Sequence, residues 1–116
     1  MDILIVKPKW ADLILLDAPK RKTWEIRGCN TTKRGRIGIA KSKTQKIYGE
    51  VTITDSIPLT KQLWEENKEK HQVLISWEDL LKHYKKPYAW VFSNAVQYES
   101  VVPYIHKPGA VIWVKQ

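Results

Sequence analysis

Residues 46–54 form the clearest β-strand pattern of this chain. One face of the segment carries Ile47, Gly49, Val51 and Ile53, and the other carries Tyr48, Glu50, Thr52 and Thr54. A period of two is typical of a strand that has one face against a core. Gly49 interrupts the apolar face, which indicates a β-bulge or a tight bend. The segment therefore favours a curved sheet, such as the wall of a small barrel.

Other stretches that are rich in β-branched, aromatic or alternating residues predict the remaining strands. They cover residues 2–6, 23–27, 36–41, 88–92, 98–105 and 110–114. Pro103 interrupts one of them, and Pro108-Gly109 predicts the turn before the last. We expect Trp90 to lie in the core, whereas Tyr88 is compatible with either a core position or stacking on a base.

A first helix is predicted from Pro8, which suits a first helical turn, to about Asp17. Apolar residues occupy almost its whole circumference, so we expect it to be largely buried, Trp10 included.

Two further helices are predicted in the middle of the chain. Thr60 can cap a helix that runs to about His71, and Ser76 and Asp79 form a capping box for another. An apolar stripe at helical spacing follows Ser76 and consists of Trp77, Leu80, Leu81 and Tyr84. We expect this stripe to pack against another part of the protein.

These elements predict an α+β fold. About six short strands, one N-terminal helix and helices inserted mid-chain fit a small β-barrel decorated by helices. A chain of 116 residues is large enough for one core but not for two, so we expect a single domain over residues 1–116.

Positive charge is concentrated between residues 20 and 46. This segment has ten Lys or Arg residues and a single acid, Glu25, whereas the whole chain has a net charge of +8. Clustered cations gain affinity for a polyanion by releasing the counterions condensed on its phosphates. The clustering favours a nucleic-acid partner over ordinary solubility charge, and we expect Lys33, Arg34 and Arg36 to contact phosphates.

The only acid of this segment lies in the pattern Lys22-x-x-Glu25-x-Arg27. Strand parity places Glu25 and Arg27 on one face and Trp24 and Ile26 on the core face. Arg27 offers a planar fork of donors, Lys22 a mobile charge, and Glu25 an acceptor for amino groups or ribose hydroxyls. The alternative is an ordinary ion pair with no ligand.

This pattern resembles the signature of the ASCH domain family, GxKxxExR, whose fold is similar to the PUA-type RNA-binding barrel. Further segments look like elements of that fold: Ile5-Val6-Lys7-Pro8, Ile47-Tyr48-Gly49-Glu50-Val51, Tyr88-Ala89-Trp90 and Ala110-Val111-Ile112-Trp113. One departure is Lys20, which stands where the family has glycine. The resemblance implies a PUA-like barrel with a cleft beside the first helix. That cleft would be lined by Lys22, Glu25 and Arg27, with Lys7 at its mouth, and would bind RNA or a modified nucleotide.

The resemblance leaves two functions open. Some ASCH-like proteins are similar to hydrolases that act on acylated cytidine, and others to ribonucleases. A hydrolase would use Lys22 and Glu25 as its catalytic residues. The threonine of the amidohydrolase branch would fall at Trp24, which cannot be a nucleophile, and Thr23 is one position away. The same cleft serves a binding module equally well, so the sequence does not decide whether the protein is an enzyme.

Other classes of site are not indicated. The single cysteine, Cys29, excludes an internal disulfide and a multi-thiolate metal site, and His71, His83 and His106 have no ligand spacing. We therefore expect no metal and no cofactor. No apolar run reaches the length of a membrane span and no signal peptide is recognisable, so we expect a cytoplasmic protein. The sequence does not indicate an oligomeric state.

Overall fold

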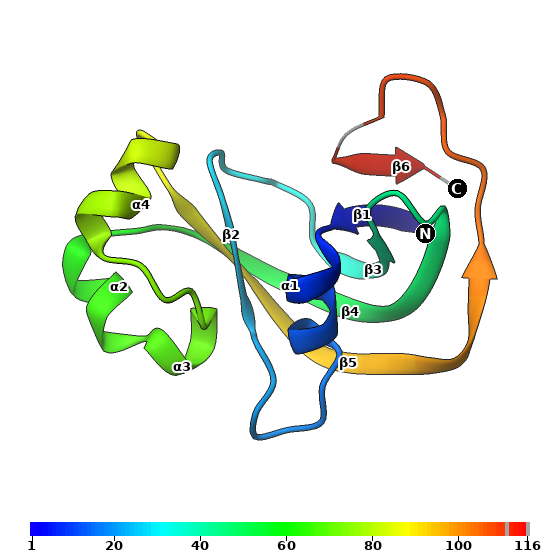
Figure 1. The fold of residues 1–116 in the computed structure, drawn as a ribbon, viewed down its shortest axis with the longest axis horizontal. Coiled ribbons are helices and arrows are strands. Elements are labelled where there is room, and N and C mark those ends of the chain that lie inside the picture. Colours follow the sequence, from blue (N-terminus) through cyan, green and yellow to red (C-terminus); the bar gives the residue numbers. More distant parts are fainter. Residues whose placement is uncertain (111, 116) are drawn as a thin grey trace.

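The computed structural model describes residues 1–110 and 112–115. Its strands form one curled sheet, a partly closed barrel, in the order β2-β5-β4-β3-β1-β6 (Figure 1). They are β1 (Asp2–Val6), β2 (Trp24–Arg27), β3 (Gly35–Lys41), β4 (Lys46–Pro58), β5 (Tyr88–Pro103) and β6 (Trp113–Lys115). The predicted α+β fold built on about six strands is confirmed.

The strands β1 and β3 are parallel neighbours, whereas the other paired strands are antiparallel. A parallel pair needs a crossover connection, which here contains helix α1 (Pro8–Ile14) and β2. The carboxyl ends of β1 and β3 consequently lie side by side. There the Ser42 amide donates a hydrogen bond of 2.8 Å to the Val6 carbonyl, which places Ser42 beside Lys7 at the rim of the barrel.

Three short helices between β4 and β5 form a separate group, which we call the helical lobe. They are α2 (Lys61–Glu66), α3 (Lys68–His71) and α4 (Trp77–His83). Figure 1 shows the lobe on the left, with β2 between it and α1. A cluster that includes Trp24, Trp64 and Leu80 packs the lobe against β2. A second cluster fills the barrel, and α1 joins it through Ala11 and Ile14.

The predicted parity of residues 46–54 is confirmed, since Ile47, Gly49, Val51 and Ile53 are all buried. The pairing of β4 with β5 shifts its register between Ile47 and Gly49, which is the predicted irregularity. A Cβ atom on Gly49 would lie 2.4 Å from the Val96 carbonyl oxygen, so only glycine permits this approach of the two strands.

Both predicted helix caps are present. The Thr60 hydroxyl accepts a hydrogen bond of 3.2 Å from the Leu63 amide, and the Ser76 hydroxyl accepts one of 3.1 Å from the Asp79 amide. Each satisfies an amide that the first helical turn leaves without an intrahelical partner.

The first helix differs from its prediction in length and burial. It ends at Ile14 rather than near Asp17, because Leu15 leaves the helical conformation at the C-cap. Only one side is covered: Ala11 and Ile14 are buried, whereas Asp12 is exposed and Trp10 is partly exposed. The helix lies at the rim of the barrel, so its outer face meets solvent despite its apolar composition.

The predicted helix from Thr60 to His71 is broken in two at Asn67. The Asn67 side-chain amide donates 2.8 Å to the Leu63 carbonyl, the group that its backbone amide would bind in a continuous helix. In the stripe after Ser76, Leu80 is buried but Leu81 is 39% exposed, so the predicted packing of that stripe holds only in part.

The strands predicted over residues 88–92 and 98–105 are one bent strand, β5. Its register against β4 shifts on both sides of Val96, and Asn94 has a positive φ, so local irregularities interrupt the sequence pattern without ending the strand. The last strand begins at Trp113 rather than Ala110, and residue 111 of that prediction lies outside the described residues.

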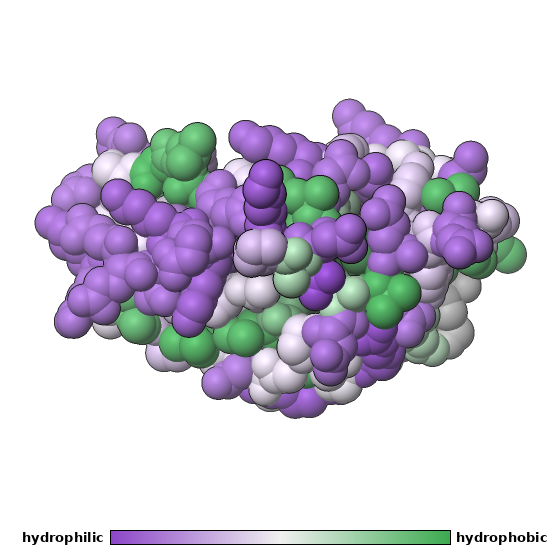
Figure 2. All heavy atoms as spheres, turned by 90° about the horizontal axis from the view of Figure 1, so that it is seen from below, coloured by the Kyte–Doolittle hydropathy of each residue, from purple (hydrophilic) through white to green (hydrophobic). Residues whose placement is uncertain are grey.

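The face shown in Figure 2 is dominated by hydrophilic residues, with apolar residues in small separate groups. Within residues 1–110 and 112–115, no helix is long and apolar enough to cross a membrane.

Candidate functional site

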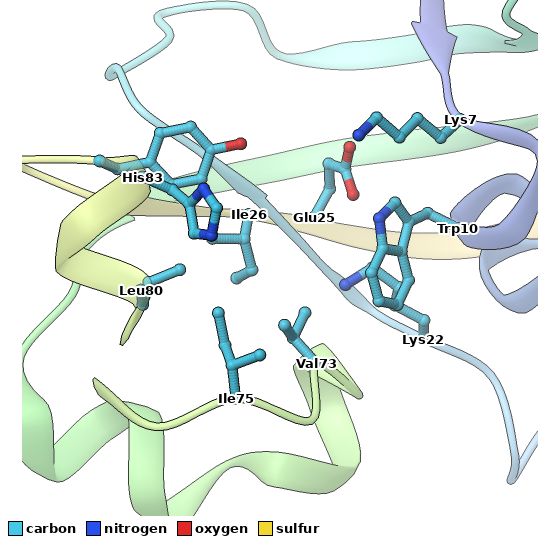
Figure 3. A pocket seen from close by; sticks show the side chains of 10 residues that line it. Lys7, Trp10, Lys22, Glu25, Ile26, Val73, Ile75, Leu80 and His83 are labelled. Atoms are coloured by element: carbon cyan, nitrogen blue, oxygen red, sulfur yellow. The ribbon is translucent and has the colours of Figure 1, made fainter. Parts of the chain in front are cut away.

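A pocket of about 310 Å³ opens between α1 and the helical lobe, along the edge strand β2. We call it the Lys22 pocket. Its walls combine charged, aromatic and aliphatic side chains: Lys7, Trp10, Lys22, Glu25, Ile26, Val73, Ile75, Leu80, His83 and Tyr84. In Figure 3 Trp10 and Lys22 face His83 and Leu80 across the pocket, while Glu25 and Ile26 lie between them on β2.

Lys22 is 1% exposed, which is unusual for a lysine. Its Nζ donates a hydrogen bond to the His71 carbonyl oxygen and lies 4.8 Å from the centroid of the Trp10 ring. Burial lowers the pKa of Lys22 to about 8, with Arg27 adding to this effect and the negative charge of Glu25 opposing it. An appreciable neutral fraction of the amine is therefore present near neutral pH.

Glu25 and Arg27 form an ion pair on the face that strand parity predicts. Arg27 Nε and Nη2 each lie 2.9 Å from Glu25 Oε2, and Glu25 is 4% exposed. Arg27 Nη2 also donates 3.0 Å to the Ile5 carbonyl, and the guanidinium lies 5.5 Å from the centroid of the Trp90 ring. These contacts hold the carboxylate in one position.

A second pocket of about 320 Å³ adjoins the first, and we call it the Arg27 pocket. The two share five lining residues: Lys7, Trp10, Glu25, Ile26 and Tyr84. Glu25 thus faces both cavities. Lys7 is exposed, and its side chain extends toward the Glu25 carboxylate in Figure 3.

His71 supports this site from inside the helical lobe. Its ring stacks on Trp64 with centroids 3.7 Å apart, Nδ1 accepts 3.0 Å from the Val73 amide, and Nε2 lies 2.8 Å from the Trp64 carbonyl. Because Nδ1 accepts, the proton is on Nε2 and the ring is neutral. Burial lowers the pKa of His71, which agrees with this tautomer. The expectation of a structural rather than a metal-binding role fits these contacts.

The remaining predicted site residues lie elsewhere. Lys33 pairs with Asp2, Arg34 Nη2 lies 3.8 Å from Asp55 Oδ1, and Arg36 Nε donates 2.7 Å to Glu50 Oε1. None of these three cations lines the Lys22 or the Arg27 pocket. The structure therefore brings together Lys7, Lys22, Glu25 and Arg27, and places Lys33, Arg34 and Arg36 away from them.

Two predictions about aromatic residues can be compared with the structure. Trp24 and Trp90 are buried as expected, but Trp10 is partly exposed and lines both pockets. The sequence could not show this, because apolar residues occupy almost the whole circumference of the helix and do not mark an exposed side. The sequence predicts Leu80 and Tyr84 only as members of a packing stripe. It gives no sign of Val73 and Ile75, since the loop after α3 that carries them has no motif.

The arrangement suits a small planar ligand with polar edges. The Glu25 carboxylate can accept hydrogen bonds from amino or hydroxyl groups, and Lys7 can contact an anionic group. Trp10 and Tyr84 offer aromatic surface, and a pocket near 300 Å³ is at the lower end of the size range of small-molecule sites. Within the described residues, no group of three or more His, Cys, Asp or Glu side chains could hold a metal ion.

Comparisons with known proteins agree with this fold. The family model of the ASCH domain matches residues 4–102. A crystal structure of the S128A mutant of ZmASCH from Zymomonas mobilis superposes with a TM-score of 0.71 at 15% identity, covering 99% of this chain and 88% of that one. A crystal structure of ASCH from the same organism superposes with a TM-score of 0.63 at 16% identity, covering 83% of this chain and 68% of that one. No curated protein sequence matches this chain.

Proposed function

We propose that this chain, which belongs to the ASCH domain family, binds RNA or a modified nucleotide in the cleft that holds Lys22, Glu25 and Arg27. The base would enter the Lys22 pocket, with its polar edge toward Glu25. The phosphate would lie near Lys7 and Arg27, at the mouth that the Lys22 and Arg27 pockets share.

The burial of Lys22 and Glu25 beside an open cavity is the observation that carries this proposal. Burying charged groups costs free energy, and replacing such groups by apolar residues is often neutral or stabilising. An ion pair that serves no ligand would be expected on the surface, where its charges stay hydrated and it contributes little to the stability of the fold. Buried charges that line a pocket are instead typical of sites that bind or transform a ligand.

Lys33, Arg34 and Arg36 would extend the contact to phosphates outside the cleft. Each already has an acidic or carbonyl partner, so an incoming phosphate would compete with that partner or share the cation with it. The single cysteine, Cys29, is free and exposed, which suits a reducing compartment, and we propose that the protein acts in the cytoplasm.

Hydrolysis of RNA or of acylated cytidine in the same cleft is the second candidate. The lowered pKa of Lys22, about 8, favours it, because a partly neutral amine can accept a proton near neutral pH. In that case Lys22 would be the base, and Glu25, held as a carboxylate by Arg27, would orient the substrate. Trp24 lies in the core, so the strand supplies no hydroxyl at that position.

Calorimetric titration with cytidine 5′-monophosphate and with acylated cytidine tests the binding proposal. We expect Glu25→Gln to weaken binding about threefold to tenfold, because the amide keeps the shape but loses the charge. Arg27→Lys keeps a charge but loses the fork of donors, and should weaken binding about tenfold. Arg21→Lys is the matched control, since Arg21 lines neither pocket. Equal affinity of the parent and all three variants would contradict the proposal.

Chromatography of acylated cytidine and of RNA, each incubated with the protein, tests the second candidate. A hydrolase should release free cytidine or shorter RNA, and Lys22→Met should reduce that rate at least about 100-fold. If the ligand binds but no product appears after long incubation, the hydrolase candidate is excluded and only the binding function stands.

A further inference from the structure

A third cavity continues the cleft on the side away from the helical lobe. It has a volume of about 300 Å³, and we call it the Tyr104 pocket. It shares Ile5 and Ser42 with the Arg27 pocket, just as the Arg27 pocket shares Glu25 with the Lys22 pocket. The three cavities are therefore consecutive sections of one groove.

The groove crosses the rim where β1 and β3 end in parallel. Ser42 follows β3 and is held by its hydrogen bond to the Val6 carbonyl. The turn after it exposes Lys43 and Gln45, both with positive φ, and the Gln45 carbonyl accepts 3.1 Å from the Tyr104 amide. Backbone bonds thus fix this end of the groove to the barrel, so that it is preformed rather than a mobile loop.

Both ends of the groove offer a cation and an aromatic ring. The adjoining Lys22 and Arg27 pockets share Lys7 and Trp10, and the Tyr104 pocket has Lys43 with His106. Tyr104 also lines that pocket, but it is only 8% exposed, and its ring lies 6.1 Å from that of His106 between centroids at an angle of 56°. The half-buried His106 ring is therefore the one on which a base can stack. Cations that follow a backbone, alternating with rings on which bases stack, are the common design of sites for single-stranded nucleic acid.

We infer that the groove binds a single-stranded RNA segment of about three nucleotides, with a distal nucleotide held in the Tyr104 pocket by Lys43, His106 and Tyr104. This inference rests on the proposed function, which concerns only the first nucleotide. Lys43 would contact the distal phosphate, the His106 ring would stack on the base, and the exposed edge of Tyr104 would contact it. Ser42 and Gln45 offer a hydroxyl and an amide to ribose 2′-hydroxyl groups, which favours RNA over DNA.

Affinity as a function of ligand length tests the inference. The probes are cytidine 5′-monophosphate and oligocytidylates of two, three and five nucleotides, titrated calorimetrically into the full chain. We expect the trimer to bind at least about tenfold more tightly than the monophosphate, because each further base that stacks on a ring adds affinity. The pentamer should add little, since the groove has only three sections. No gain in affinity with length would overturn the inference.

Two variants and one control locate the distal contacts. Lys43→Gln removes the charge while keeping a long side chain at a positive-φ position, and His106→Ala removes one ring. Each should weaken trimer binding about threefold to tenfold and leave binding of the monophosphate unchanged. Lys43→Gln should also reduce the slope of log affinity against log salt concentration by about 0.7. Lys86→Gln, at an exposed lysine outside the groove, is the matched control. Equal effects of Lys43→Gln and Lys86→Gln would overturn the inference.

Failure of this inference is distinguishable from failure of the proposed function. If Glu25→Gln weakens binding of the monophosphate but longer oligonucleotides bind no more tightly, only the distal site is wrong. If the trimer depends on Lys43 while Glu25→Gln and Arg27→Lys change nothing, the distal site stands and the proposed function is wrong. Equal affinity for the deoxycytidylate trimer would overturn the assignment to RNA.

Discussion

Lys22 Nζ donates a hydrogen bond to the backbone carbonyl of His71, a residue 49 positions further along the chain. This bond connects the pocket wall next to β2 with the end of α3. Because the same lysine lies over the ring of Trp10 in α1, it touches both sides of the cleft. The width of the Lys22 pocket is therefore set by a residue of the candidate site itself.

The lowered pKa of Lys22 predicts a pH dependence of stability. The unfolded chain keeps this proton up to a pH near 10.5, whereas the folded chain loses it near 8, so the unfolded state binds more protons between these values. The free energy of unfolding should therefore rise with pH in this window relative to Lys22→Met, with a slope approaching about 1 kcal/mol per pH unit. Chemical denaturation of both proteins from about pH 7.5 to about pH 9.5 measures the difference. Parallel curves would contradict a perturbed lysine.

His71→Gln should destabilise the protein by about 3 kcal/mol, because it removes the stack on Trp64 and leaves a buried amide or carbonyl without its partner. His83→Gln is the matched control, and should change stability by less than about 0.5 kcal/mol, since His83 is exposed. Denaturation near neutral pH gives both values. The lowered pKa of His71 adds a second test: relative to His71→Gln, the parent should lose stability as the pH falls below about 6.5.

Gly49→Ala should cost about 3 kcal/mol, since the new Cβ would lie 2.4 Å from a backbone oxygen of β5 and the strands would have to separate. A Cβ atom on Gly38 would meet only side-chain atoms, the nearest of them Cγ2 of Ile47 at 3.3 Å, and these can move, so the cost of Gly38→Ala should be clearly smaller. Comparison of the two denaturation midpoints checks this. Similar midpoints would show that the bend in β4 does not need glycine.

Ser76→Ala should cost about 1 kcal/mol through the lost N-cap of α4. Leu80→Ala should cost about 2–5 kcal/mol because Leu80 is buried. Trp77 is only partly buried, so Trp77→Ala should cost less than the roughly 3–5 kcal/mol expected for a core tryptophan. Urea denaturation of the three variants ranks these contributions, and equal small losses would contradict the packing of α4 on β2.

Charge reversal of Lys33, Arg34 and Arg36 together should flatten the salt dependence of RNA binding if these residues contact phosphates. For a single strand the slope should fall by about 0.7 for each phosphate that the variant no longer neutralises. The same change at Lys68, Lys70 and Lys82 is the control, because these lysines belong to the helical lobe. Fluorescence anisotropy with labelled RNA, from about 50 to about 300 mM salt, measures both slopes. Equal slopes would remove the basic segment from the proposed interface.

The sequence determined those features that depend on neighbouring residues. Period-two alternation correctly assigned the buried face of residues 46–54, and the caps at Thr60 and Ser76 are present. The parity that places Glu25 beside Arg27 is also local, because two residues of one strand point the same way whatever the fold. These predictions succeed because the interactions behind them are between residues close together in the chain.

Tertiary structure alone decided the surroundings of those residues. The basic segment has a single acid in sequence, yet Asp2, Asp12, Glu50 and Asp55 from other segments lie against its cations. Likewise the apolar wall of the Lys22 pocket comes from the helical lobe, and Trp10 is partly exposed because α1 lies at the rim of the barrel. Burial and electrostatic environment depend on every element that packs nearby, so no local pattern in this chain could indicate that Lys22 would be buried and its pKa lowered.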